Sequence, residues 1–388
     1  MQMLLDKRNT TNCRVMWDCE FYLQMIKMLI GFNNPAISSL LSTVITRECT
    51  VFVKEIIDFE QSLKSAVENS TSQLFQNSFP LIREKIHYFP SQPFNYDAEK
   101  EIYANIINGM QQYFLTRPKD DMYHLRNDLS YIKSNGLIYC SSIDMYALTY
   151  GTPIMKDGEV HGRAIMQYCQ DLSSVISNVQ RGFSATEASE LIHLHNLSPK
   201  HNLNFDFYNG KFDMAVEAIK CSEFITTLAL RMLNDIGTIR FIVEKGLTDN
   251  WSNTNMLYFI VRLIAIRFDE ISDALYKIEN DFPNKETSSF INLLKNNEIL
   301  PFPEDTRKVA KKLRNSIHYN AQNEIWTVDL SKPFYWYECF LKQVNTKTRV
   351  FNTYPDDFII FKNEMMEHLN KLHRLLSSTF DYKLEADD

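Results

Sequence analysis

The chain contains few residues that interrupt helices. Only 10 glycines and 12 prolines occur in 388 residues. Between them, apolar residues recur at spacings of three and four, which is the period of one face of an α-helix. The clearest example is the segment 35–69, with apolar positions at Leu41, Val44, Ile45, Val51, Val53, Ile56 and Ile57. This combination predicts a mostly α protein built from helical bundles.

The same period predicts the remaining helices. We expect them at 15–32, 97–115, 119–134, 163–178, 212–247 with a break near Gly237, 256–280, 287–296, 304–319 and 355–380. The segment 136–162 differs, because it holds β-forming residues and a Lys156-Asp157-Gly158 turn signal. It therefore predicts a small β-hairpin insert.

A polar, turn-rich stretch at 196–211 is the best candidate for a domain boundary. It predicts an N-terminal helical region, 1–205, that carries the small β insert and has a regulatory or sensor role. A C-terminal helical bundle, 206–388, would follow.

Composition narrows the class of protein. The net charge is −7, so any contact with nucleic acid must be local, because phosphate binding depends on clustered positive charge. Seven scattered cysteines without a Cys-x-x-Cys pair indicate reduced thiols in a cytoplasmic protein. The most apolar run, 256–266, is interrupted by Arg262 and is too short to span a bilayer, so we expect no membrane contact.

No cofactor or metal site is predicted. Phosphate-binding loops and nucleophile-elbow motifs are missing from the sequence. His193 and His195 would point in different directions on a helix and could not converge on a metal ion there.

Positive charge is concentrated in "KKLRNSIHYN", residues 311–320, and just before it. On a helical wheel, Val309, Ala310, Leu313, Ser316 and Ile317 form a core-facing stripe. Beside that stripe lie Arg307, Lys311, Arg314 and His318, which form one positive face.

Arg314 and His318 are four residues apart, so they would be neighbours on consecutive helical turns. Histidine can take the proton of a ribose 2′-hydroxyl or protonate the departing oxygen, and arginine can stabilise charge on the phosphate. Asn315 would orient the histidine or hold a phosphate. The pattern predicts metal-independent RNA cleavage, with contacts to RNA from Arg307, Lys308, Lys311, Lys312 and Tyr319.

Arg314-Asn315 followed by His318 near the end of a basic helix resembles the signature of the HEPN family, over roughly residues 212–380. The arginine and histidine are closer together here than is usual in that family. The resemblance implies a helical-bundle endoribonuclease, usually a homodimer, with two motifs that meet in one composite cleft. It also implies a role in prokaryotic antiviral defence or in a toxin–antitoxin system, with an antitoxin or regulatory protein as partner.

Two other segments share letters with this motif. "IREKIHY" contains Arg83 and His87, and "LRNDLSYIKSN" contains Arg126 and Asn127 with Ser130 in the position of the histidine. They are either degenerate copies, which could place two half-sites in one chain, or coincidences among short helical words. The flanking sequence shows no similarity, which favours coincidence.

A second function also fits the same residues. The basic helix face could belong to a non-enzymatic HEPN-like module that binds a protein partner or a nucleotide. Loss of charge at Lys311 or Arg314 would then matter more than loss of His318.

Overall fold

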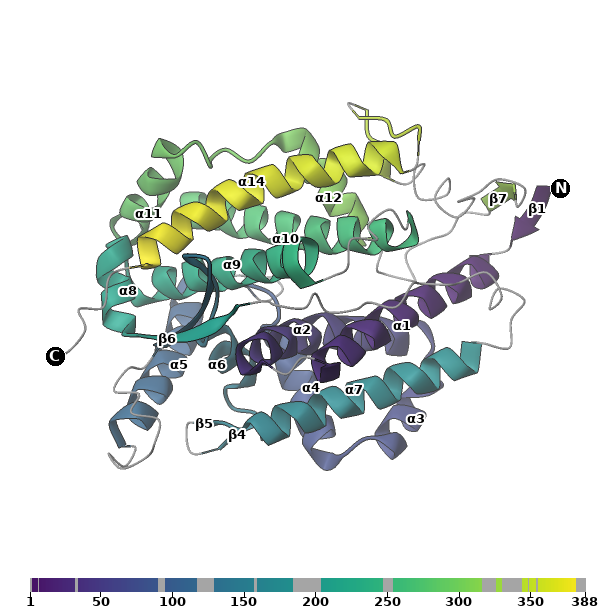
Figure 1. Cartoon of the computed structure of the whole chain (residues 1–388), viewed down its shortest axis with the longest axis horizontal. Coiled ribbons are helices and arrows are strands. Elements are labelled where there is room, and N and C mark those ends of the chain that lie inside the picture. The colour runs from purple at the N-terminus through teal and green to yellow at the C-terminus, as the bar shows by residue number, and fades with distance from the viewer. Residues whose placement is uncertain are drawn as a thin grey trace.

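The structure is a computed structural model, and it describes residues 2–5, 7–31, 34–89, 95–116, 129–156, 159–183, 204–246, 254–315, 326–329, 344–347, 349–353 and 355–381. It is mostly helical with small strand pairs, so the predicted fold class is confirmed (Figure 1). Strand β1 (Gln2–Leu5), the first described element, lies at the right of this view.

The N-terminal helices occupy one side of the molecule. They are α1 (Lys7–Gly31), α2 (Pro35–Phe59), α3 (Leu63–Ser70), α4 (Gln73–Lys85), α5 (Tyr96–Thr116), α6 (Ile143–Thr149) and α7 (Gly162–Phe183). Helices α1, α2 and α7 pack against one another. Helix α2 begins at Pro35 because the Asn34 side chain accepts hydrogen bonds from the amides of Ala36 and Ile37.

The prediction of a single helix over 35–69 was wrong at its end. Helix α2 stops at Phe59, and a separate short helix, α3, begins at Leu63. Among the described helices, α2 alone is long and apolar enough to span a membrane, but 83% of that stretch is buried in the protein. Such burial is what a core helix requires.

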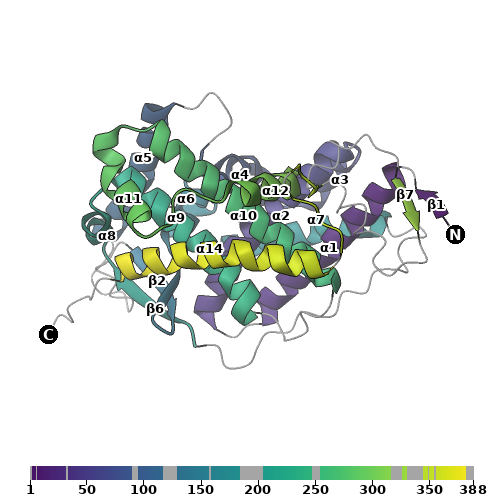
Figure 2. The same cartoon turned by 90° about the horizontal axis from the view of Figure 1, so that it is seen from above.

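The C-terminal helices form the other side. They are α8 (Phe212–Ile219), α9 (Glu223–Arg240), a π-helical turn η2 (Phe241–Gly246), α10 (Thr254–Asn280), α11 (Asn284–Asn296), α12 (Glu304–Asn315) and α14 (Asp356–Phe380). Helix α10 lies in the middle and packs against α9, α12 and α14 (Figure 2). It therefore connects the predicted basic helix to the core.

Three strands form the largest sheet, in the order β3 (Leu137–Ser141), β2 (Leu129–Ser134), β6 (Asp206–Gly210), all antiparallel. The β2–β3 turn has positive φ at Asn135 (51°) and Gly136 (75°), as a tight hairpin turn requires. Two smaller antiparallel pairs join β4 (Met155–Lys156) to β5 (Glu159–Val160), and β1 (Gln2–Leu5) to β7 (Trp326–Asp329).

These strands confirm the predicted β insert and correct one predicted helix. Residues 129–134 of the expected helix 119–134 form β2, and 119–128 lie outside the described residues. The Asn135-Gly136 turn and the partner strands on both sides of β2 favour the extended conformation over the helix.

The core continues across the predicted domain boundary at residue 205. Strand β2 from the N-terminal region pairs with β6 from the C-terminal region, and α2 packs against α9. One cluster of buried hydrophobic residues extends from Val15 to Phe380. The division into two domains stays a prediction, and the described residues of both parts share this core.

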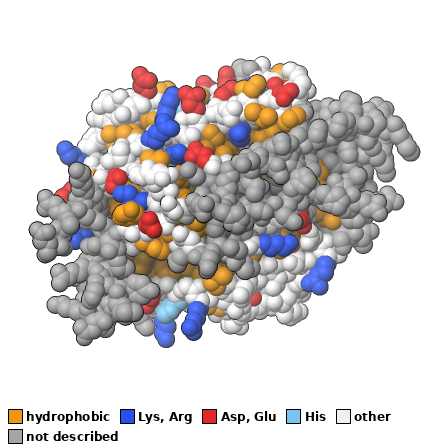
Figure 3. All heavy atoms as spheres, in the orientation of Figure 1, with side chains coloured by type: hydrophobic (Ala, Val, Ile, Leu, Met, Phe, Trp, Pro, Cys, Tyr) orange, Lys and Arg blue, Asp and Glu red, His pale blue; other side chains and the backbone are white. Residues whose placement is uncertain are grey.

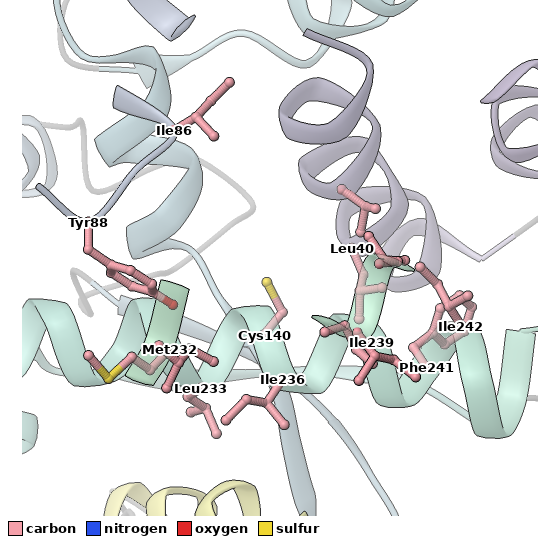
Figure 4. Packing of buried hydrophobic residues seen from close by; sticks show 14 of the residues in the cluster. Leu40, Ile86, Tyr88, Cys140, Met232, Leu233, Ile236, Ile239, Phe241 and Ile242 are labelled. Carbon is pink, nitrogen blue, oxygen red and sulfur yellow. The ribbon is translucent and has the colours of Figure 1, made fainter. Parts of the chain in front are cut away.

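Helix α9 passes through the centre of that core. Figure 4 shows Met232, Leu233, Ile236 and Ile239 leaving α9 toward neighbouring elements, with Leu40 from α2 and Cys140 from β3 close by. The expected break at Gly237 was wrong, because α9 continues from Glu223 to Arg240. Gly237 is instead a point of close approach, where an added Cβ would lie 1.9 Å from the Tyr139 carbonyl oxygen of β3.

We therefore expect Gly237→Ala to destabilise the protein by about 2 kcal/mol or more, because a Cβ would push β3 away from α9. Gly182→Ala in α7 is the matched control, since an added Cβ there meets no atom within 4 Å. That control should change stability little or raise it slightly. Urea unfolding of the two variants tests this, and equal midpoints would contradict the close-approach explanation.

Candidate functional site

The predicted basic helix is present as α12, and its apolar stripe is confirmed where the structure describes it. Val309, Ala310 and Leu313 are fully buried. Helix α12 starts after Pro303, with Glu304 and Asp305 in its first turn, where acidic side chains are favourable. The described helix ends at Asn315, so Ser316, Ile317, His318 and Tyr319 lie outside the described residues.

The predicted positive face turns partly inward. Arg307 and Arg314 both point to α10, where Arg307 pairs with Asp273 at 3.0 Å and Arg314 with Asp269 at 2.7 Å. Asp269 is buried, and burial raises its pKa to about 6 although Arg314 lowers it. Two of the arginines predicted to contact phosphate therefore have carboxylate partners in this structure.

The other residues of the helix remain near the surface. Lys308 pairs with Glu304 on its own helix at 2.8 Å, and Lys312 donates to the carbonyl oxygen of Asn345. Lys311 and Asn315 are exposed. Their proposed contacts to RNA stay predictions.

A cavity of about 330 Å³ opens beside α12, and residues from two of the arginine-containing motifs found in the sequence line it. Arg314 lines it, and so do Arg83 and His87 from "IREKIHY". Its walls come from α1, α2, α10 and the end of α4. Residues that are more than two hundred positions apart in the sequence therefore line the same cavity.

The hydrogen bonds of His87 define its tautomer. Arg83 Nη1 lies 3.3 Å from His87 Nε2, and His87 Nδ1 lies 3.0 Å from Glu270 Oε1. Because arginine can only donate, Nε2 must accept, and the ring proton belongs on Nδ1, which donates to the carboxylate. The imidazole is thus held by a buried acid at Nδ1, with Nε2 facing Arg83 on the other side.

His87 occupies this position because α4 ends immediately before it. Arg83 lies in the last turn of α4, and the carbonyl groups of Lys85 and Ile86 have no partners within the helix. Two buried arginines satisfy them. Arg231 donates to the Lys85 oxygen at 2.9 Å, and Arg47 donates to the Ile86 oxygen at 3.0 Å.

Charged side chains around the cavity are mostly paired. Glu270 also accepts from Arg267 at 2.5 Å. Burial alone would raise the pKa of Glu270, but Arg267 and the hydrogen bond from His87 hold it well below its usual range, so it is ionised. Arg267 also pairs with Glu48, and Arg262 pairs with Asp18.

Arg83 differs from these arginines. Among the described residues it has no carboxylate partner, and its buried Nε atom has no hydrogen-bond partner. A guanidinium that lines a cavity in this state can accept an anionic ligand without breaking an ion pair.

Sequence reasoning discounted Arg83 and His87 and missed Glu270 and Arg267. The available signal was charge inside an apolar helical run, since Arg262, Arg267 and Glu270 interrupt the apolar stretch of α10. Charged residues in a buried helix must be paired or functional. That rule marks α10 as the wall of a polar site, although it does not identify the partners.

The third motif-like segment, residues 125–135, has a different structure. The described part of "LRNDLSYIKSN" forms strand β2, so it does not reproduce the helical motif, and Arg126 and Asn127 lie outside the described residues. His193 and His195 also lie outside them. Among the described residues no three histidine, cysteine or acidic side chains are grouped as metal ligands, and the expectation of a metal-free site stays a prediction.

Comparison of the chain with protein-family models, with curated proteins and with solved structures found no match in any of the three. The function must therefore be argued from the geometry of the site.

The ion pair of Arg314 gives a pH-dependent prediction. Replacing Arg314 with glutamine leaves Asp269 buried without its partner, so its pKa should rise above about 6. At a pH above about 6, the folded variant must either bury an unpaired Asp269 carboxylate or add a proton to it, and both cost free energy. At a lower pH the Asp269 carboxyl is already neutral, so loss of Arg314 costs less. We expect Arg314→Gln to cost about 2 kcal/mol at pH 8 and less than half of that at pH 5.

Guanidinium unfolding at the two pH values measures this difference. Lys308→Gln is the control on the same helix, because Lys308 pairs only with exposed Glu304, and it should change stability equally at both. A cost for Arg314→Gln that does not depend on pH would contradict the assignment of the pair.

Proposed function

We propose that the protein is a metal-independent endoribonuclease whose active site is the cavity lined by Arg83, His87 and Arg314. The observation that carries the proposal is the orientation of the His87 imidazole, which is hydrogen-bonded to buried Glu270 through Nδ1 and to Arg83 through Nε2. An oriented imidazole can transfer a proton, and arginines beside it can stabilise the negative charge of a phosphate.

The reaction follows from these positions. A phosphate of bound RNA takes Arg83 as its partner, which frees the lone pair on His87 Nε2. That nitrogen removes the proton of the ribose 2′-hydroxyl, the 2′-oxygen attacks phosphorus, and the bond from phosphorus to the 5′-oxygen breaks. Arg83 and Arg314 stabilise the charge that builds on the phosphate, and Glu270 stabilises the imidazolium that forms.

The leaving 5′-oxygen needs a proton from a second group. From the sequence alone, His318 is the candidate for this role, with Asn315 beside it. The products would be a 2′,3′-cyclic phosphate and a free 5′-hydroxyl, so atoms and protons balance without an oxidant or a second substrate.

This arrangement fits the resemblance to the HEPN family. That resemblance implies two arginine–histidine motifs in one composite cleft, and here Arg83 and His87 share a cavity with Arg314. With both motifs in one chain, a dimer would not be needed to complete the site. The homodimer, the antitoxin or regulatory partner and the role in antiviral defence rest on the resemblance and are part of the proposal.

The rival function, a docking module that uses the basic face of α12, is less well supported. Arg307 and Arg314 are paired with α10, and Lys308 is paired with Glu304, so much of that face is already neutralised. A docking role would also leave the arrangement of His87 with Arg83 and Glu270 without a purpose.

We expect purified protein to cleave RNA in excess EDTA, and His87→Ala to lower the cleavage rate by about 10²–10⁴-fold, the usual range for loss of a general base. RNA affinity should change little, because an imidazole contributes less to phosphate binding than an arginine. Arg83→Gln should reduce both. Gel analysis of a labelled RNA and a filter-binding assay provide the two readouts.

His161→Ala and Arg181→Gln are the matched controls. His161 directly precedes α7 and Arg181 lies on it, and both side chains are exposed and do not line the cavity. Both should cleave at the wild-type rate. If His87→Ala cleaves normally while His318→Ala is inactive, catalysis belongs to the second motif alone. If no variant differs and EDTA abolishes cleavage, the proposed mechanism is wrong.

A variant of Glu270 separates positioning from binding. Glu270→Gln keeps an oxygen that can accept from His87 Nδ1 but removes the charge that stabilises the imidazolium. We expect kcat to fall by about 10-fold or more with KM nearly unchanged, since Glu270 would act on the transition state through His87. Equal kcat and a raised KM would assign Glu270 to substrate binding instead.

A further inference from the structure

A second cavity, of about 550 Å³, lies between α2, α7, the β2–β3–β6 sheet and α6. Figure 3 shows one face of the molecule, on which hydrophobic side chains are exposed between charged ones. None of the residues that line this second cavity belongs to the candidate active site. The volume is in the range that holds a small organic ligand.

Hydroxyl groups line one wall. Helix α2 contributes Ser38, Ser39, Ser42 and Thr43, positions that recur on one helical face. Ser42 and Thr43 donate their hydroxyl protons to the carbonyl oxygens of Ser38 and Ser39, at 2.7 and 3.1 Å. Their donors are therefore used within the helix, and each hydroxyl oxygen keeps a free lone pair that can accept a hydrogen bond.

The other walls are mixed, with the polar side chains Ser130, Ser141 and Ser142 beside apolar ones. Ile132, Ile165, Met166 and Val160 line the cavity, and Phe207 of β6 reaches it with half of its surface exposed. An exposed aromatic ring at the edge of a cavity offers a flat face for another ring. Glu159 is the only charged side chain among the described lining residues, and it adds one more acceptor.

We propose that this cavity binds an uncharged ring compound rich in hydrogen-bond donors, and specifically a nucleoside. The ribose hydroxyls donate to the oxygens of Ser42, Thr43 and Glu159, and the base lies against Phe207 and the apolar side chains. A nucleotide is disfavoured, because the described lining residues include no cation and the carboxylate of Glu159 repels a phosphate. The proposal does not depend on the ribonuclease assignment.

Calorimetric titration of the full chain with adenosine, guanosine, cytidine and uridine tests the proposal. We expect at least one nucleoside to bind with a Kd below about 1 mM and its 5′-monophosphate to bind about 10-fold more weakly. Ribose and glucose are included to measure the contribution of the base, and they should bind more weakly than the nucleoside.

Three variants locate the ligand. Thr43→Val removes one acceptor without changing the shape of the side chain, and Glu159→Gln removes the charge; each should weaken binding by about 5–10-fold. Ser39→Phe fills the mouth of the cavity from an exposed position and should abolish binding. Thr46→Val is the matched control on the same helix, because Thr46 faces Cys169 and does not line the cavity.

Arg83→Gln should leave nucleoside affinity unchanged, because Arg83 lines the 330 Å³ cavity and not this one. This variant therefore shows which of the two cavities binds the nucleoside. The proposal is overturned if no nucleoside binds, if Ser39→Phe binds like the wild type, or if a monophosphate binds as tightly as its nucleoside. Free sugars that bind as tightly as nucleosides would reject the nucleoside as ligand. Circular dichroism of each variant verifies that loss of binding is not loss of folding.

Discussion

Arg47 and Arg231 connect most of the elements that surround the candidate active site. Arg47 on α2 pairs with Asp144 of α6 and Asp235 of α9, and Arg231 of α9 pairs with the same Asp144 at 3.1 Å. All four side chains are almost completely buried. Removing charges from water is costly, so such a network adds less to stability than its contacts suggest, but loss of one member leaves an uncompensated buried charge. The network joins α2, α6 and α9 through three specific ion pairs.

The end of α4 connects this ion-pair network to the proposed active site. The same two arginines donate to the carbonyl oxygens of Lys85 and Ile86, so the last turn of α4 has a fixed position relative to α2 and α9. His87 follows directly, and α10 supplies Glu270 to its Nδ1 atom. Tyr88 adds a hydrogen bond to Asp235, whose pKa is raised by burial although Arg47 lowers it. A site assembled in this way depends on long-range ion pairs more than on local sequence.

This dependence explains what the sequence could predict. Helical period and the low glycine content were sufficient for the fold class, for α12 and for its buried stripe, because these follow from neighbours within a few positions. The strand β2 was mistaken for a helix although the Asn135-Gly136 turn to its neighbour β3 was a local signal, and its second partner, β6, is about 75 positions further along the chain. Arg83 and His87 were visible as a short motif, but the contact of His87 with Glu270 and the cavity shared with Arg314 are tertiary, and α10 packs against α12. A helix break was predicted at Gly237 because the contact that explains this glycine, with Tyr139 of β3, is tertiary and not visible in the sequence.

The charge balance of the cavity determines how RNA would enter it. The chain is acidic overall, and most arginines around the cavity form ion pairs with carboxylates. The long-range electrostatic attraction for a polyanion is therefore small. Arg83 offers the first contact, because it has no carboxylate partner among the described residues. Arg314 can follow if phosphate replaces Asp269 as its partner. That exchange costs little, since the raised pKa of Asp269 lets the displaced carboxyl take up a proton near neutral pH instead of remaining as a buried charge. In the proposed mechanism, Asp269 would keep Arg314 in place until a phosphate binds, and Arg83 would be the group that recognises the phosphate.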